Sequence, residues 1–132
     1  MSAEGIGAEL AHALAVKDFT RVRGLLKDDI DFRGMTPGSL WETNDADKVI
    51  GEILTEWFED EDEIQGLIEC SSGSVGDRHH VSYLFDVLNP GGRFLVQQQM
   101  YFDLDDGRIA FARVLCSGYQ PAGGAEIHSL EI

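Results

Sequence analysis

The spacing of apolar residues predicts helices in the first half of the chain. Over residues 6–16 the apolar side chains recur at the interval of one helix face, and a second short face follows Asp18, a suitable N-cap. The clearest helical pattern follows Asn44 and Asp45, either of which can cap it. Its apolar positions are Val49, Ile50, Ile53, Leu54, Trp57 and Phe58. We therefore expect a long amphipathic helix over this stretch.

The segments on either side of that helix are less regular. Residues 30–33 predict a short strand, and residues 34–44, which contain Pro37 and Gly38, predict a loop. The acidic run at residues 59–63 predicts a solvated connection, because adjacent like charges repel one another. A metal site is less favoured there, since the run lacks the glycine and the spaced ligands of a calcium loop.

The second half of the chain predicts antiparallel strands. Four segments are rich in β-branched and aromatic residues, namely residues 64–72, 79–88, 94–103 and 108–116. Turns separate them at residues 73–77, at Asn89-Pro90-Gly91-Gly92 and at Asp105-Asp106-Gly107. Helices followed by a meander indicate an α+β domain whose helices pack on one face of the sheet.

Length and charge limit the possible classes of protein. The 132 residues suit a single domain over residues 1–132, with a core over about residues 6–119 and a loosely ordered tail at residues 120–132. Ten Lys and Arg against 24 Asp and Glu give a net charge of −14, which argues against nucleic-acid and membrane-surface partners. The N-terminus shows no signal-peptide pattern, so we expect a cytoplasmic protein.

The sequence shows none of the motifs of the large enzyme classes. It has no P-loop, dinucleotide fingerprint, nucleophile elbow or His-Glu zinc motif. Cys70 and Cys116 match no metal-ligand spacing, and we expect both to be small buried side chains. We therefore expect neither a metal nor a cofactor.

Alternation along the strands predicts which side chains share a face. In residues 79–88, His80 and Asp86 lie opposite Val81 and Tyr83. In the next strand Gln97, Gln99 and Tyr101 share one face, and glutamine is costly to bury without partners, so this face should meet water or a ligand. In the last strand a face of small residues leaves room for a ligand or a helix; it includes Ala112, Val114 and Cys116.

The order of these elements resembles that of the nuclear transport factor 2-like superfamily, which includes SnoaL-like polyketide cyclases, ketosteroid isomerase and limonene epoxide hydrolase. The local resemblances are Val16-Lys17-Asp18-Phe19, Asp28-Asp29-Ile30-Asp31-Phe32 and Asp105-Asp106-Gly107-Arg108-Ile109. The resemblance implies a cone-shaped fold in which N-terminal helices pack on a strongly curved, mainly antiparallel sheet. Such a fold encloses a pocket for an apolar small molecule, and it often forms homodimers.

The resemblance also implies positions for the site. Aligned on Gly107, Gln99 falls where ketosteroid isomerase has an acid that donates a hydrogen bond, so an oxyanion donor is expected there. The tyrosine of that isomerase falls near Leu10, and its general base falls near Gly34 or Arg33. Ketosteroid isomerisation itself is therefore not expected.

We expect a SnoaL-like protein of secondary metabolism that performs cofactor-independent acid–base chemistry on an apolar carbonyl compound. The reaction would be a cyclisation, isomerisation, dehydration or epoxide hydrolysis. Gln99 and Tyr101 would polarise an oxygen, and Asp86 or His80 would move a proton. The ligand-binding residues would be Trp41, Leu54, Trp57, Tyr83, Gln97, Ala112, Val114 and Cys116.

Three alternatives stay open at this point. If Val81 lies on the concave face, Tyr83 points into the pocket and Asp86 points out. A non-catalytic ligand-binding or assembly module of the same fold is the alternative function. For His80 and Asp86, which lie close to turns, a solvent-facing position is favoured over a catalytic one. For the homodimer, the expected contact patch on the convex face consists of Phe94, Val96, Met100 and Phe102.

Overall fold

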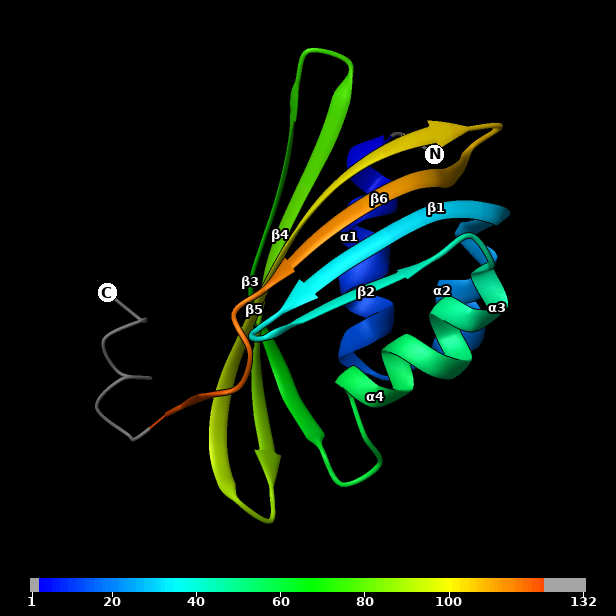
Figure 1. Ribbon diagram of the computed structural model, residues 1–132. Helices are drawn as coiled ribbons and strands as arrows, with labels where there is room; N and C mark the ends of the chain where they lie inside the picture. The colour runs from blue at the N-terminus through cyan, green and yellow to red at the C-terminus, as the bar shows by residue number, and fades with distance from the viewer. Residues whose placement is uncertain (1–2, 123–132) are drawn as a thin grey trace.

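The computed structural model describes residues 3–122 (Figure 1). Two helices begin the chain, α1 (Ala3–Ala15) and α2 (Phe19–Gly24). Asp18 caps α2 by accepting a hydrogen bond from the Arg21 backbone N–H at 3.1 Å, as predicted. Most of the tail expected at residues 120–132 lies outside the described residues.

The predicted amphipathic helix is present and is continuous over three segments. It consists of α3 (Ala46–Lys48), a π-helical stretch η1 (Val49–Leu54) and α4 (Thr55–Trp57). Asp45 caps it by accepting a hydrogen bond from the Asp47 backbone N–H at 2.9 Å. Five of its apolar side chains are buried, namely Val49, Ile53, Leu54, Trp57 and Phe58.

The sheet is curved, open and mostly antiparallel. Its strands are β1 (Leu26–Thr36), β2 (Ser39–Thr43), β3 (Glu63–Val75), β4 (Arg78–Asn89), β5 (Gly92–Asp105), β6 (Arg108–Cys116) and β7 (Gln120–Pro121). The order is β2-β1-β6-β5-β4-β3, with β7 paired to β5 and only the β1–β6 pair parallel among the described strands. Figure 1 shows the sheet bending around α1, with α3 following the end of β2. The predicted α+β fold with its meander is therefore confirmed.

The loop predicted at residues 34–44 is instead a β-hairpin. Strand β1 continues to Thr36 and pairs with β2 from Phe32 opposite Thr43 to Thr36 opposite Ser39. Pro37 and Gly38 form the turn, and Gly38 has a positive φ of 79°. Proline followed by a residue with positive φ is the arrangement of a type II turn, so these residues reverse the strand instead of ending it.

The concave face of the sheet carries the core. On β4 the buried residues of this face are Val81, Tyr83, Phe85 and Val87, and on β5 they are Val96, Gln98, Met100 and Phe102. The Val81 face is therefore the concave one, and Tyr83 points inward. The expectation that Gln97 and Gln99 face the pocket is wrong, because they alternate with the buried set. The dimer patch expected from Val96, Met100 and Phe102 is also wrong, since all three lie in the core.

Two smaller expectations also fail. Asp62, within the acidic run, is only 8% exposed. It accepts hydrogen bonds from the Glu59 backbone N–H and the Asn89 side chain, both at 2.9 Å, so these donors replace water around it. Cys116 is buried as predicted, but Cys70 is exposed. Cys70 lies on β3, an edge strand that pairs with a neighbouring strand on one side only.

Candidate functional site

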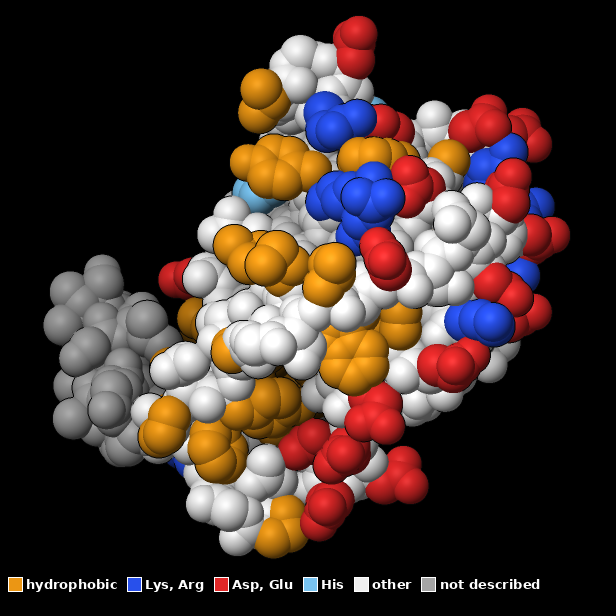
Figure 2. All heavy atoms as spheres, in the orientation of Figure 1, with side chains coloured by type: hydrophobic (Ala, Val, Ile, Leu, Met, Phe, Trp, Pro, Cys, Tyr) orange, Lys and Arg blue, Asp and Glu red, His pale blue; other side chains and the backbone are white. Residues whose placement is uncertain are grey.

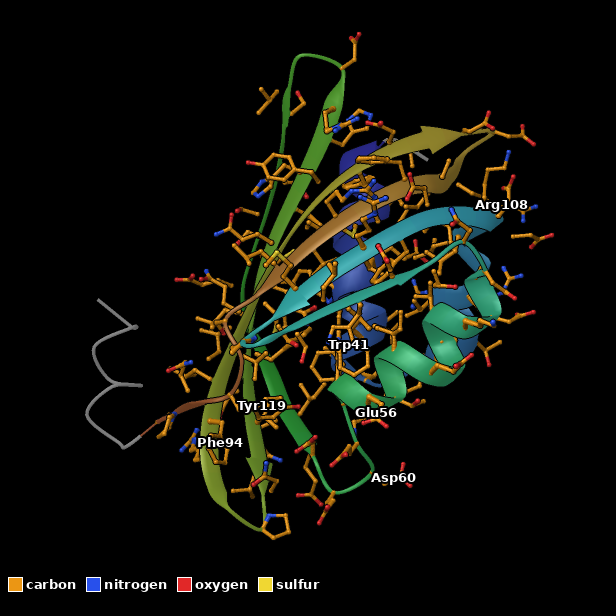
Figure 3. The ribbon with its side chains drawn as sticks, viewed as in Figure 1. Trp41, Glu56, Asp60, Phe94, Arg108 and Tyr119 are labelled. Carbon is orange, nitrogen blue, oxygen red and sulfur yellow. The ribbon has the colours of Figure 1, made fainter. Side chains whose placement is uncertain are left out.

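A pocket of about 440 Å³ opens between the β1–β2 hairpin, α4, β5 and the segment after β6. Figure 2 shows a hollow with hydrophobic side chains around it and acidic side chains beside it. In Figure 3, Trp41, Glu56 and Tyr119 come from three different parts of the chain and lie around this opening. Four of the twelve lining residues are aromatic, namely Trp41, Trp57, Phe58 and Tyr119, and Glu56 is the carboxylate that belongs to the lining.

The floor of the pocket is formed by Trp57 and Gln98. A smaller cavity of about 20 Å³ lies deeper in the core, and the same two residues line it as well. The rest of that inner cavity is apolar apart from Tyr83. Trp57 and Gln98 thus lie between the open pocket and the inner cavity.

Gln98 holds an unusual position for an amide. Its side chain is 1% exposed, and its Oε1 accepts a hydrogen bond from the Tyr83 hydroxyl at 2.7 Å. Burial raises the pKa of Tyr83, so that hydroxyl keeps its proton and acts as the donor. The Nε2 group of Gln98 is left without a partner among the described residues.

Trp57 contributes a second free donor to the same floor. Its indole Nε1 is buried and has no hydrogen-bond partner within residues 3–122. A buried donor without a partner costs about 1–3 kcal/mol, and native proteins leave few of them unexplained. The two residues that carry these donors line both the pocket and the inner cavity.

The position of the Trp57 ring is fixed by packing on several sides. Its ring centroid lies 5.9 Å from that of Phe32 and 6.3 Å from that of Trp41, the latter in a T-shaped contact. Trp41 donates its own Nε1–H to Thr36 Oγ1 at 2.8 Å. Because this N–H is already paired, Trp41 contributes an aromatic wall to the pocket and no free donor. Gly34 on β1 leaves the space that the Trp57 ring occupies.

Tyr119 fastens the segment after β6 to the end of α4. Its hydroxyl lies 2.7 Å from the Trp57 carbonyl oxygen and 3.1 Å from Asp62 Oδ2. Burial, with a further contribution from the Asp62 charge, raises the pKa of Tyr119. The hydroxyl is therefore protonated at neutral pH. Its hydrogen bonds connect the segment after β6, which lines one side of the pocket, to the end of α4, which lines another.

Seven of the residues predicted to bind a ligand lie around these two cavities. Trp41, Trp57 and Cys116 line the larger pocket, whereas Leu54, Tyr83, Ala112 and Val114 line the inner cavity together with Trp57. The sequence thus identifies most of the apolar walls. It does so because small and aromatic side chains on a concave face leave or border open space.

The predicted catalytic residues lie on the opposite face of the sheet. His80 Nε2 is 3.2 Å from Gln99 Oε1, and the His80 ring packs against Tyr101, both outside the pocket. Asp86 forms a two-pronged ion pair with Arg93 at 3.0 and 2.5 Å. The assignment of these groups to the pocket is therefore wrong, and Gln97 shares their face.

The error at Gln99 is a shift of one residue along β5. The register between β5 and β6 shifts where Asp103 pairs with Phe111 and Leu104 with Ile109, but the extra residue lies on β6, and the alternation of β5 itself is unbroken. An alignment that is off by one residue on β5 exchanges its two faces. Gln98, one residue earlier, is the glutamine that points inward, and only the run of three glutamines marked it in the sequence.

No helix within residues 3–122 has the length and apolar composition that a membrane span requires. That part of the chain also contains no group of three His, Cys, Asp or Glu side chains placed to hold a metal ion.

Comparison with known proteins identifies the fold. No protein-family model matches the chain, and no curated protein matches it. An NTF2-like protein from Burkholderia thailandensis has a TM-score of 0.67 at 12% identity, covering 97% of this chain and 95% of that one. A candidate polyketide cyclase from Pseudomonas putida has a TM-score of 0.66 at 13% identity, covering 98% of both chains. An LEH-like epoxide hydrolase from M. tuberculosis has a TM-score of 0.61 at 16% identity, covering 88% and 86%.

Proposed function

Because the chain has the fold of the nuclear transport factor 2-like superfamily, we propose that its pocket binds an apolar small molecule through a carbonyl oxygen. The observation that carries this proposal is the pair of buried, unpartnered donors, Trp57 Nε1 and Gln98 Nε2. Both groups donate only, and a carbonyl oxygen accepts two hydrogen bonds. The aromatic walls would hold the rest of the molecule.

We further propose that the protein catalyses cofactor-independent acid–base chemistry next to that carbonyl. Removal of a proton from the adjacent carbon turns the carbonyl into an enolate, whose negative oxygen would be stabilised by the two donors. Glu56, the carboxylate in the pocket lining, would accept the proton. Cyclisation, isomerisation and dehydration can all proceed through such an enolate. The name of one similar structure, a polyketide cyclase, is compatible with this proposal.

A non-catalytic binding protein is the second candidate function. The observation that favours it is the exposure of Glu56, since a hydrated carboxylate is a weaker base than a partly desolvated one. The two candidates share the same binding site, so binding and turnover need separate measurements.

Binding is tested with two probes that differ only in the oxygen, acetophenone and ethylbenzene. NMR titration of the wild type should show tighter binding of acetophenone, with shifts of the Trp57 indole and Gln98 amide signals. Gln98→Leu and Trp57→Phe should each reduce acetophenone affinity by about tenfold and leave ethylbenzene affinity nearly unchanged. Equal losses for both probes, or no loss for either, would contradict the proposed donor site.

Turnover is tested by exchange of the acetophenone methyl protons for deuterium in D2O, followed by NMR. An enzyme of this class should accelerate the exchange above the rate in buffer, and Glu56→Gln should abolish the acceleration. Glu52→Gln is the matched control, because Glu52 is exposed on the same helix and does not line this pocket. Normal binding of acetophenone without accelerated exchange would favour the non-catalytic protein.

A further inference from the structure

We infer that Tyr83 is a positioning residue that makes the pocket select hydrogen-bond acceptors over hydrogen-bond donors. The inference rests on the proposed function and concerns the same floor. A glutamine side chain has an oxygen that accepts and a nitrogen that donates, and the two ends are nearly equal in size. What the pocket recognises therefore depends on which end of the Gln98 amide faces it.

The orientation of the Gln98 amide is fixed by its contact with Tyr83 in the core. Tyr83 on β4 and Gln98 on β5 are direct cross-strand partners, and both are almost completely buried. The Tyr83 hydroxyl donates to Gln98 Oε1 at 2.7 Å, which leaves Nε2 as the end of the amide without a partner among the described residues. The Tyr83 ring is held in turn by Phe85, with the ring centroids 5.3 Å apart.

Reversing the amide would leave the Tyr83 hydroxyl hydrogen without its acceptor. Nε2 would then donate to the hydroxyl oxygen, and that hydrogen would need a new partner. The inner cavity beside Tyr83 offers none, because its other lining side chains are apolar or, in the case of Trp57, donate only. A buried hydroxyl without an acceptor is costly, so the observed orientation is strongly preferred.

The pocket floor therefore presents two donors and no side-chain acceptor. The indole N–H of Trp57 can only donate a hydrogen bond. The hydrogen bond from Tyr83 occupies the oxygen of Gln98, so the free end of the Gln98 amide is also a donor. A ligand that offers a ketone oxygen satisfies both groups. A ligand that offers only an N–H meets two like groups on the floor and leaves both of these donors unpaired, which disfavours its binding there.

The test compares an acceptor-only probe, acetophenone, with a donor-only probe, indole, by NMR titration. The wild type should bind acetophenone more tightly than indole. In Tyr83→Phe the amide is free to reverse, so the ratio of the two affinities should shift toward indole by about tenfold. Tyr101→Phe, on the outer face where Tyr101 is 42% exposed, is the control and should leave the ratio unchanged.

The outcomes separate this inference from the proposed function. If Gln98→Leu reduces acetophenone binding but Tyr83→Phe leaves the ratio unchanged, the role of Tyr83 is wrong and the binding site stands. If Gln98→Leu has no effect on acetophenone, the proposed binding site itself is wrong. If Tyr83→Phe does not fold, NMR titration of the wild type with the two probes still tests the inference. Larger shifts of the Gln98 amide signals with indole than with acetophenone would overturn the inference.

Discussion

At the residue scale, the absence of a side chain at Gly34 makes room for the donor on Trp57. A Cβ at position 34 would lie 2.4 Å from Trp57 Cη2 and 2.8 Å from Cζ2, well inside the contact distance of two carbons. Because Trp57 is itself packed against Phe32 and Trp41, its ring has little freedom to move aside.

We therefore expect Gly34→Ala to lower the free energy of unfolding by about 1–3 kcal/mol, the usual cost of overpacking. It should also weaken acetophenone binding, because the displaced ring carries Nε1 away from the pocket floor. Gly66→Ala on β3 is the control, since a Cβ there would meet nothing within 4 Å. Urea unfolding and NMR titration measure the two effects. Equal effects of the two substitutions would contradict the packing argument.

A second residue-scale prediction concerns the buried tyrosine at pH above neutrality. Burial raises the pKa of Tyr83 above the ordinary value of 10.0. Above that pH the unfolded chain loses this proton and the native chain keeps it, so stability must fall as pH rises. The contribution of Tyr83 to this slope is at most about 1.4 kcal/mol per pH unit.

Urea unfolding between pH 8 and pH 11 should therefore show a flatter pH dependence for Tyr83→Phe than for the wild type. Part of the dependence should remain in that variant, because the pKa of Tyr119 is also raised by burial. Tyr101→Phe provides the reference for an exposed tyrosine. Parallel curves for Tyr83→Phe and the wild type would show that ionisation of Tyr83 is not linked to unfolding.

At the element scale, the predictable parts are those in which local pattern and tertiary environment agree. The helix over residues 46–57 and the strands β3 to β6 follow from periodicity, N-caps and turns, and each begins or ends within a few residues of its expected position. The β1–β2 hairpin was missed because its short strands carry no clear alternation. Its pairing depends on β6, which is far away in the sequence.

The donor site could not be predicted to the residue, because alternation along β5 separates two faces without showing which one is concave. The concave face is the one that packs into the core, and this packing involves residues far away in the sequence. A shift of one residue exchanges the pocket face for the outer face. The run of glutamines therefore identified the right segment of β5 and the wrong side chain. Trp57 was predicted as a wall, but its unpartnered Nε1 emerges only from the packed structure.

The helix that carries Trp57 gives an element-scale prediction. Trp57 is 7% exposed and packs against both β1 and β2 through Phe32 and Trp41. Trp57→Ala should lower the free energy of unfolding by about 3–5 kcal/mol, the range for a large buried aromatic side chain. Trp41→Ala should cost clearly less, because Trp41 is only half-buried at the pocket mouth. A loss below about 1 kcal/mol for Trp57→Ala, measured by chemical denaturation, would contradict its role in the core.

At the scale of the whole molecule, the outer face of the sheet differs from the rest of the acidic surface. Four arginines lie there in ion pairs, Arg33 with Glu42, Arg78 with Asp103, Arg93 with Asp86 and Arg113 with Asp31. Figure 2 shows basic side chains on the upper part of this face with hydrophobic side chains next to them. This face is therefore close to neutral, whereas the chain carries a net charge of −14.

An apolar row crosses three strands of the same face. Leu40 on β2 pairs with Met35 on β1, and Met35 pairs with Leu115 on β6. Their exposed fractions are 60%, 54% and 61%. These residues replace the expected patch, of which Val96, Met100 and Phe102 lie in the core and Phe94 packs against Tyr119. We therefore still expect a homodimer that forms through the outer face of the sheet, but with Met35, Leu40 and Leu115 as the contact residues.

We expect two copies to associate through this row, because it combines exposed apolar area with the least charge repulsion between two acidic molecules. Light scattering should give the mass of a dimer at micromolar concentration. Added salt should strengthen the association by screening the remaining repulsion. Leu115→Asp should give a monomer, whereas Val16→Asp, at the end of α1 and 73% exposed, should leave the dimer intact. A wild-type monomer at these concentrations, or a Leu115→Asp dimer of unchanged affinity, would show that this face is not the interface.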